Sequence, residues 1–165
     1  MANVWFTSDL HFGHNNIYKF REDVYSEEGN RTKIIDHWHK LVTKRDDVYV
    51  LGDAAFSMDT LQEFSNLPGR KFLIRGNHDE FSSIEYAPHF ADVYGLKKYK
   101  EFWLSHAPIH PAELRGKVNL HGHVHYESIP DVRYFNMCVE NLWKLGYPSL
   151  ISLEQLRKEL EYTNT

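Results

Sequence analysis

Residues 47–53, Asp-Val-Tyr-Val-Leu-Gly-Asp, place a glycine and a carboxylate directly after a continuous apolar run. Such a run is typical of a strand buried inside a sheet. A related arrangement occurs on either side along the chain, where residues 3–8 precede Asp9 and residues 71–75 precede Gly76. We therefore predict three inner strands, each followed by polar residues.

Segments of helical periodicity separate these strands. Apolar residues recur at helical spacing from Asn30, predicted to be the N-cap, to about Lys44, and Asp59 is predicted to cap a shorter helix that stops at Pro68-Gly69. Residues 11–28 are polar and are predicted to form a long loop with at most a short helix. Alternating strands and helices favour parallel strands joined by crossover helices.

The second half of the chain is richer in strands. Ser152 and Gln155 form a capping box for a last helix that is expected to end near Tyr162. We find no repeat, low-complexity segment or linker, so residues 1–165 are predicted to form a single α/β domain. Strands in this half are expected at residues 90–94 and 101–105, and weaker patterns indicate further strands at residues 118–121, 134–138 and 149–151.

The composition is that of an ordinary globular protein, with 42% hydrophobic and 25% charged residues. A net charge of −4 gives no general basic field for nucleic acid, so nucleic-acid binding is not supported by charge, although a local basic patch remains open. The single cysteine, Cys138, allows no intrachain disulfide and no cysteine-based zinc site. Without a signal-peptide pattern or an apolar run of about 20 residues, the sequence predicts a cytoplasmic protein with no membrane segment.

Side chains of the kind that bind metals collect just after the predicted strands. In open parallel sheets, ligands bind beyond the carboxyl ends of the strands. Carboxylates and imidazoles bind divalent cations, and two such cations about 3.5–4 Å apart can clamp a phosphoryl group. Each segment alone is more often a turn or a pair of surface histidines, but their conjunction predicts a metal site. The segments are Asp9 with His11, Gly52-Asp53, Gly76-Asn77-His78-Asp79, His106 and Gly122-His123-Val124-His125.

These motifs, in this order, resemble the pattern of the calcineurin-like metallophosphoesterases. The family pattern is Asp-x-His, Gly-Asp, Gly-Asn-His-Asp/Glu, a later His and Gly-His-x-His, and every part is present between residues 9 and 125. One departure is Ala54-Ala55-Phe56, where the family commonly has other polar or aromatic residues after Gly-Asp. The resemblance implies two packed mixed β-sheets flanked by helices, a four-layer α/β/β/α sandwich, in a small member without a cap.

The resemblance also implies roles for individual residues. One divalent cation would be bound by Asp9, His11, Asp53 and His125, and a second by Asp53, Asn77, His106 and His123, with Asp53 as the bridge. We expect manganese first, with iron, nickel, zinc and magnesium as alternatives. Water activated between the two cations would attack the phosphorus directly. His78 would stabilise the transition state or protonate the leaving oxygen, and Asp79 would orient His78.

Three residues are candidate substrate contacts. His14 and Asn15 lie on the loop after the first ligand pair, where loops face the predicted metals, although an ordinary surface loop is as good an interpretation. Arg75 precedes Gly76 and could bind a phosphate oxygen, against the alternative of a solvated strand end. Arg21 is a weaker candidate of the same type.

The function expected from this resemblance is hydrolysis of a phosphoester. The small size of the chain favours an open site and a phosphodiesterase acting on a small or flexible substrate, such as a nucleotide or an oligonucleotide end. A phosphomonoesterase (phosphatase) is the main alternative. A nuclease is less favoured because nucleases of this family usually carry extra domains, and a non-catalytic metal-binding scaffold is less favoured because all ligands and His78 are retained. The oligomeric state cannot be derived from the sequence.

Overall fold

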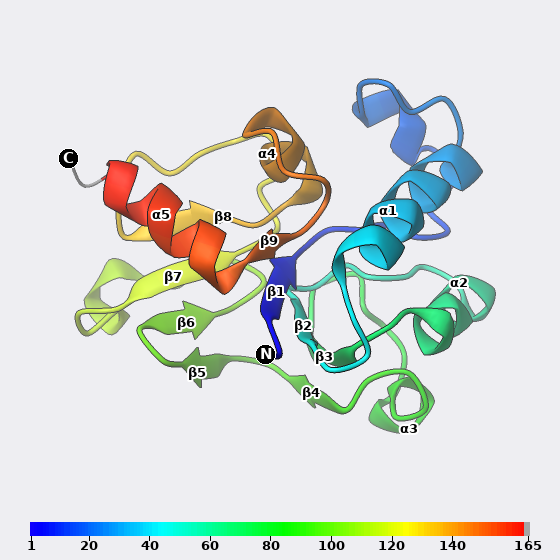
Figure 1. The fold of residues 1–165 in the computed structure, drawn as a ribbon, viewed down its shortest axis with the longest axis horizontal. Coiled ribbons are helices and arrows are strands. Elements are labelled where there is room, and N and C mark those ends of the chain that lie inside the picture. The colour runs from blue at the N-terminus through cyan, green and yellow to red at the C-terminus, as the bar shows by residue number, and fades with distance from the viewer. Residues whose placement is uncertain (164–165) are drawn as a thin grey trace.

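The computed structural model describes residues 1–163 as two mixed β-sheets flanked by helices (Figure 1). In the first sheet β1 to β4 are parallel, and β9 runs antiparallel to β1. This arrangement confirms the predicted α/β fold and its crossover connections. The strands are β1 (Val4–Thr7), β2 (Asp47–Val50), β3 (Arg70–Ile74), β4 (Asp92–Tyr94) and β9 (Ile151–Ser152), in the order β4-β3-β2-β1-β9.

The second sheet is also mixed. Its strands β6 to β8 are parallel, whereas β5 is antiparallel to β6. The sequence did not predict β5, because Lys97-Lys98-Tyr99 contains no apolar run. The strands are β5 (Lys97–Tyr99), β6 (Phe102–Leu104), β7 (Val118–His121) and β8 (Tyr134–Asn136), in that order.

Two predicted helix starts are wrong, while the last helix begins as predicted. Ser26 caps the first long helix by accepting from the amide of Gly29, so this helix starts before Asn30, which is buried inside it. Ser57, rather than Asp59, caps the next helix. The capping box of the last helix is confirmed by the two reciprocal bonds of Ser152 and Gln155, at 2.9 and 3.2 Å. The α-helices are α1 (Glu27–Leu41), α2 (Met58–Gln62), α3 (Ser83–Tyr86), α4 (Val139–Lys144) and α5 (Leu153–Thr163), and the 3₁₀ turns are η1 (Ile17–Phe20), η2 (Glu63–Asn66) and η3 (Pro111–Glu113).

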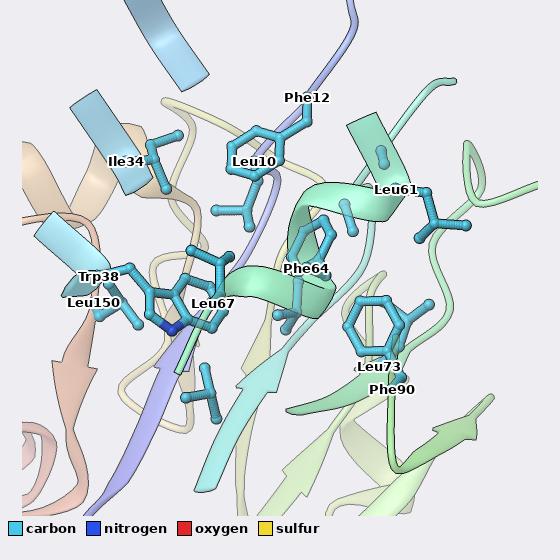
Figure 2. Close-up of a cluster of buried hydrophobic side chains, with 14 of the residues drawn as sticks. Leu10, Phe12, Ile34, Trp38, Leu61, Phe64, Leu67, Leu73, Phe90 and Leu150 are labelled. Atoms are coloured by element: carbon cyan, nitrogen blue, oxygen red, sulfur yellow. The ribbon is translucent and has the colours of Figure 1, made fainter. Parts of the chain in front are cut away.

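Two hydrophobic clusters lie on the two faces of the first sheet. One fills the space between this sheet and the helices α1 and α2, with Ile34, Trp38 and Phe64 fully buried (Figure 2). The other joins the two sheets and includes Phe6 from β1 and Phe102 from β6. Burying such aromatic side chains supplies much of the driving force for folding. No helix within residues 1–163 is both long and apolar enough to span a membrane.

The two sheets meet at the carboxyl end of β1. A short parallel bridge joins Ser8 to Cys138, and the amide of Val139 donates to the carbonyl of Ser8 at 3.1 Å. The loop after β1 also pairs with the loop after β2, because the amide of Asp9 donates to the carbonyl of Gly52 at 3.0 Å. The strand ends that carry the predicted site residues therefore come together at one edge.

Candidate metal centre

The loops at this edge bring all seven predicted metal ligands into one cluster. Four of them are buried, and the others are partly or fully exposed. Two sets have ligand atoms that all lie within 4.8 Å of one another, one formed by Asp9, His11 and His125, the other by Asp9, Asp53 and His106.

The first half of the cluster consists of Asp9, His11 and His125. Asp9 Oδ1 lies 3.6 Å from His11 Nε2 and 3.7 Å from His125 Nε2. The other oxygen, Asp9 Oδ2, accepts from Ser8 Oγ at 2.6 Å and from the amide of His123 at 2.9 Å. Asp9 Oδ1 and His11 Nε2 are buried and have no hydrogen-bond partner within residues 1–163. Buried polar atoms are normally paired, so these converging atoms suit a cation.

Asp53 lies between the two halves of the cluster. Its Oδ2 is 3.6 Å from His11 Nε2 and 3.5 Å from His106 Nε2. Its Oδ1 accepts from the backbone amide of His78 at 3.0 Å, which fixes the carboxylate in place. One oxygen thus faces imidazoles of both halves, as a bridging ligand must.

The second half consists of Asn77, His106 and His123. Asn77 Oδ1 lies 2.9 Å from His106 Nε2 and 3.2 Å from His123 Nδ1. The ring of His106 is oriented from behind, since its Nδ1 lies 2.8 Å from the carbonyl of Leu51, to which it can donate. Nε2 is then the nitrogen that carries a free lone pair toward the cluster.

The electrostatics of the site favour ionised carboxylates. Burial raises the pKa of Asp9, but the imidazoles of His11 and His106 and the Ser8 hydroxyl lower it by more, so the net value is well below the usual range. For Asp53, too, the pKa is lowered, because His11, His106 and the amide of His78 together outweigh its burial. Both groups are charged at neutral pH and can bind a cation without first losing a proton.

The backbone is strained at most of these positions. A positive φ is uncommon for residues with a side chain and collects at functional sites. It occurs here at Asp9 (56°), His11 (56°), Asp53 (52°), His123 (74°) and His125 (52°).

Close packing at the glycines of the motifs is a second constraint. A Cβ atom on Gly76 would lie 2.3 Å from Asp53 Oδ1. One on Gly122 would lie 2.1 Å from Ser8 Oγ and 2.3 Å from Asp9 Oδ2. The chain can pass this near to the two carboxylates only because these residues lack side chains.

Behind the first half lies a buried ion pair that sequence reasoning missed. Glu140 Oε1 is 2.9 Å from His125 Nδ1 and 2.8 Å from Arg21 Nη2. Arg21 also donates to the carbonyls of Asp9 and Leu10 and to Asn30 Oδ1. Its predicted role as a phosphate contact is therefore wrong, because its guanidinium is buried and bound to protein atoms. The only hint in the sequence is an acid among the apolar residues of 137–142.

His78 and Asp79 lie in different environments. The His78 side chain is exposed, and its ring centroid lies 5.1 Å from that of Phe56 and 6.1 Å from that of His11. Asp79 is buried, and its carboxylate accepts from the amides of Asp53, Ala54 and Gly76 at 2.7, 3.0 and 2.8 Å. These bonds tie two ligand loops together, so the Asp79 carboxylate orients the backbone rather than the His78 ring.

The predicted substrate contacts also differ in their surroundings. His14 is partly buried beside His11, with ring centroids 5.5 Å apart, whereas Asn15 is exposed. Arg75 lines a cavity next to His106 and His123, but its Nε donates to the carbonyl of Asp79 at 2.9 Å and its Nη2 to that of Phe81. Most of the guanidinium is therefore used to hold the loop after β3.

Comparison with known proteins agrees with this geometry. The sequence model of the calcineurin-like phosphoesterases matches residues 2–160, nearly the whole chain. The protein belongs to the calcineurin-like phosphoesterases. The resemblance seen in the motifs is thereby confirmed, and the chain is a metal-dependent phosphoester hydrolase of a family that uses two metal ions.

Relatives of this phosphoesterase occur in phages and archaea. The Gene 66 protein of Mycobacterium phage L5 is 31% identical over 169 residues, which cover 78% of this chain and 80% of the phage protein. An uncharacterized protein of Methanocaldococcus jannaschii is 33% identical over 148 residues, which cover 82% of this chain and 77% of the archaeal protein.

Three solved structures share the fold. A protein of unknown function from Aquifex aeolicus has a TM-score of 0.74 and 26% identity, covering 96% of this chain and 99% of that one. Nuclease MPE of Pseudomonas putida has a TM-score of 0.53 and 22% identity, with coverage of 74% and 61%. An archaeal phosphodiesterase has a TM-score of 0.51 and 19% identity, with coverage of 81% and 82%. The last two show the fold alone.

Proposed function

We propose that this calcineurin-like phosphoesterase is a phosphodiesterase that acts on a small or flexible substrate such as a nucleotide or an oligonucleotide end. The observation that carries the choice of a diester is the shortage of permanent positive charge around the cluster. A phosphomonoester carries up to two negative charges at neutral pH, whereas a diester carries one. Additional cationic side chains are therefore more useful to a phosphatase than to a phosphodiesterase.

The two cavities beside the cluster illustrate this shortage. The one lined by Ile17, Phe20 and Tyr126 has no lysine or arginine in its described lining. Among the described residues that line the other, Arg75 is the only lysine or arginine, and its Nε and Nη2 donate to backbone carbonyls. Two structural neighbours, described as a nuclease and as a phosphodiesterase, are consistent with a diester substrate.

The donor set fits two divalent cations of the kind the family uses. Asp9, His11, Asp53 and His125 would bind one, and Asp53, Asn77, His106 and His123 the other, manganese being our first choice. When bound, such cations lower the pKa of water and neutralise charge on phosphoryl oxygens. Asn77 and His123 are exposed, so this part of the cluster is accessible to a phosphoester from solvent.

His78 is proposed to act on the leaving group. Its backbone amide donates to Asp53 Oδ1, which keeps the residue beside the cluster, while its ring is exposed at the mouth of the site. From there an imidazolium can donate its proton to the departing oxygen. Asp79 acts indirectly, because its three bonds to backbone amides set the relative position of the loops after β2 and β3.

Hydrolysis of p-nitrophenyl esters by metal-reconstituted protein tests this proposal. The protein is stripped with a chelator and reloaded with Mn²⁺, and rates on bis-p-nitrophenyl phosphate and p-nitrophenyl phosphate are compared. We expect metal-dependent hydrolysis with a clear preference for the diester. A preference for the monoester would make the protein a phosphatase, and no hydrolysis of either ester with two bound ions would contradict the catalytic proposal.

A further inference from the structure

A cavity of about 360 Å³ shares two of its walls with the metal centre. His11 and His125 line it, and the Nε2 atoms of the same two rings lie 3.6 and 3.7 Å from Asp9 Oδ1. A group held in this cavity is therefore a direct neighbour of a phosphate bound at the centre. Its volume falls in the range of about 300–1,000 Å³ that is usual for small-molecule sites.

Three of the other lining residues are apolar or aromatic. The 3₁₀ turn η1 contributes Ile17 and Phe20, and Tyr126 follows the predicted ligand His125. Phe20 and Tyr126 remain 63% and 52% exposed, so both rings are accessible to a ligand. Because the described lining contains no lysine or arginine, it suits an uncharged flat ring better than a second phosphate.

Two polar atoms distinguish this lining from a purely apolar one. His14 Nδ1 and Glu140 Oε2 are buried and have no hydrogen-bond partner within residues 1–163, and both residues line the cavity. An imidazole such as that of His14 can donate or accept a hydrogen bond. A hydrocarbon ring would leave both groups unpaired at a cost in affinity, whereas the edge of a nucleobase offers N–H and C=O groups.

We infer that this cavity binds the nucleobase of a nucleotide whose phosphodiester is cleaved at the metal centre. The inference rests on the proposed function and deepens it by naming nucleoside phosphodiesters as the substrate class. The base would stack against the exposed aromatic side chains and hydrogen-bond to the unpaired groups. Phe20, Tyr126 and His14 are then specificity residues for a reaction that the metal ligands carry out.

Three diesters with the same leaving group test this inference on the Mn²⁺-loaded protein. They are the p-nitrophenyl esters of thymidine 5′-monophosphate, phenyl phosphate and methyl phosphate. Stacking of one base contributes about 1–3 kcal/mol, which corresponds to roughly 5- to 150-fold in affinity. We expect kcat/KM to be at least about tenfold higher for the thymidine ester than for the methyl ester, with the phenyl ester between them.

Variants then locate the preference in the structure. Phe20→Ala and Tyr126→Ala should each lower the thymidine-to-methyl ratio of kcat/KM several-fold. Tyr25→Ala is the matched control, because Tyr25 is 83% exposed and does not line this cavity, and it should leave the ratio unchanged. An equal fall in the control would overturn the assignment to the cavity, and a phenyl ester as good as the thymidine ester would overturn the choice of a base.

Failure of the inference can be told apart from failure of the proposed function. Equal rates on all three diesters would overturn nucleobase binding and leave the phosphodiesterase in place. If no diester is hydrolysed, the proposed function fails, and calorimetric titration decides the inference without turnover. Thymidine 5′-monophosphate should then bind wild-type protein more tightly than inorganic phosphate does, and Phe20→Ala should remove the difference. Equal affinity of wild-type protein for thymidine 5′-monophosphate and inorganic phosphate would overturn the inference that the cavity binds a nucleobase.

Discussion

The two halves of the predicted metal centre differ in how firmly the fold holds them. In the first half, Asp9 is fully buried and His125 is backed by the buried carboxylate of Glu140. In the second half, Asn77 and His123 are exposed and line a cavity of about 620 Å³. Residues behind the ligands orient them and strengthen metal binding. The first half is therefore the more firmly held of the two, whereas the second half is more open to solvent.

Replacing the bridge should affect both halves and have the largest effect. In Asp53→Asn the amide has only one oxygen and no charge, so it cannot offset the repulsion between two cations. We expect metal content to fall and activity to drop by more than the ~10²–10⁴-fold that loss of a general acid costs. Elemental analysis of dialysed protein and diester hydrolysis measure the two effects. Unchanged metal content per chain would show that Asp53 is not the bridge.

Removing His78 should lower turnover while both halves keep their ions. His78→Ala is expected to lose about 10²–10⁴-fold in kcat, most for poor leaving groups, because a general acid matters more as the leaving oxygen becomes more basic. A series of substituted phenyl diesters gives this dependence. His39→Ala, an exposed histidine on α1, is the control. An equal loss on every leaving group would leave His78 with charge stabilisation only.

Disturbing the support of the first half should weaken one ion more than the other. Glu140→Gln keeps the shape of the side chain but removes the charge that faces His125 and Arg21. Loss of such a partner costs about 10–100-fold in metal affinity, which competition with a chelator can measure. Thermal unfolding at saturating Mn²⁺ verifies that the variant folds, and Glu127→Gln, at an exposed position nearby, is the matched control. Equal weakening of both ions would contradict the proposed difference between the halves.

The smallest effect, on folding stability, is expected from replacing Gly122, which packs against Asp9 of the first half. In Gly122→Ala the new Cβ would lie 2.3 Å from Asp9 Oδ2, whereas a Cβ on Gly95 would have no heavy atom of residues 1–163 within 4 Å beyond Gly95 and its chain neighbours. Overpacking of this kind costs about 1–3 kcal/mol, so Gly122→Ala should lower the free energy of unfolding and Gly95→Ala should not. Urea denaturation with a chelator present separates this effect from metal binding. Equal stability of the two variants would contradict the close packing of Gly122 against Asp9.

Much of the fold could be predicted from the sequence because its inner strands are apolar and its motifs follow them directly. The runs before Asp9 and Asp53 are patterns that local reasoning detects. The misses are of another kind. Strand β5 is three polar or amphipathic residues long, and its pairing with β6 makes it a strand. The N-caps were predicted at Asn30 and Asp59, whereas the structure has them at Ser26 and Ser57. Several residues that make good N-caps stand close together in both segments, and local sequence does not decide between them.

The residues predicted to bind the metals could be nominated from the sequence, whereas the residues that support them could not. Motif order was enough to nominate residues such as Asp9 and His125, although their role as ligands stays a prediction. The contact of Glu140 with His125 and Arg21 joins segments 15 and 119 residues apart, and no local pattern encodes it. The aromatic cavity depends on where η1 lies relative to Tyr126, which only the three-dimensional structure reveals.

The left-handed backbone at five of the seven predicted ligands has a consequence for how this chain can change over time. Glycine would adopt those conformations at lower cost than histidine or aspartate. A lineage released from catalysis could therefore gain stability by replacing these residues with glycine one at a time. Keeping all five residues therefore lowers the stability of the fold, and selection for catalysis explains why the chain retains them.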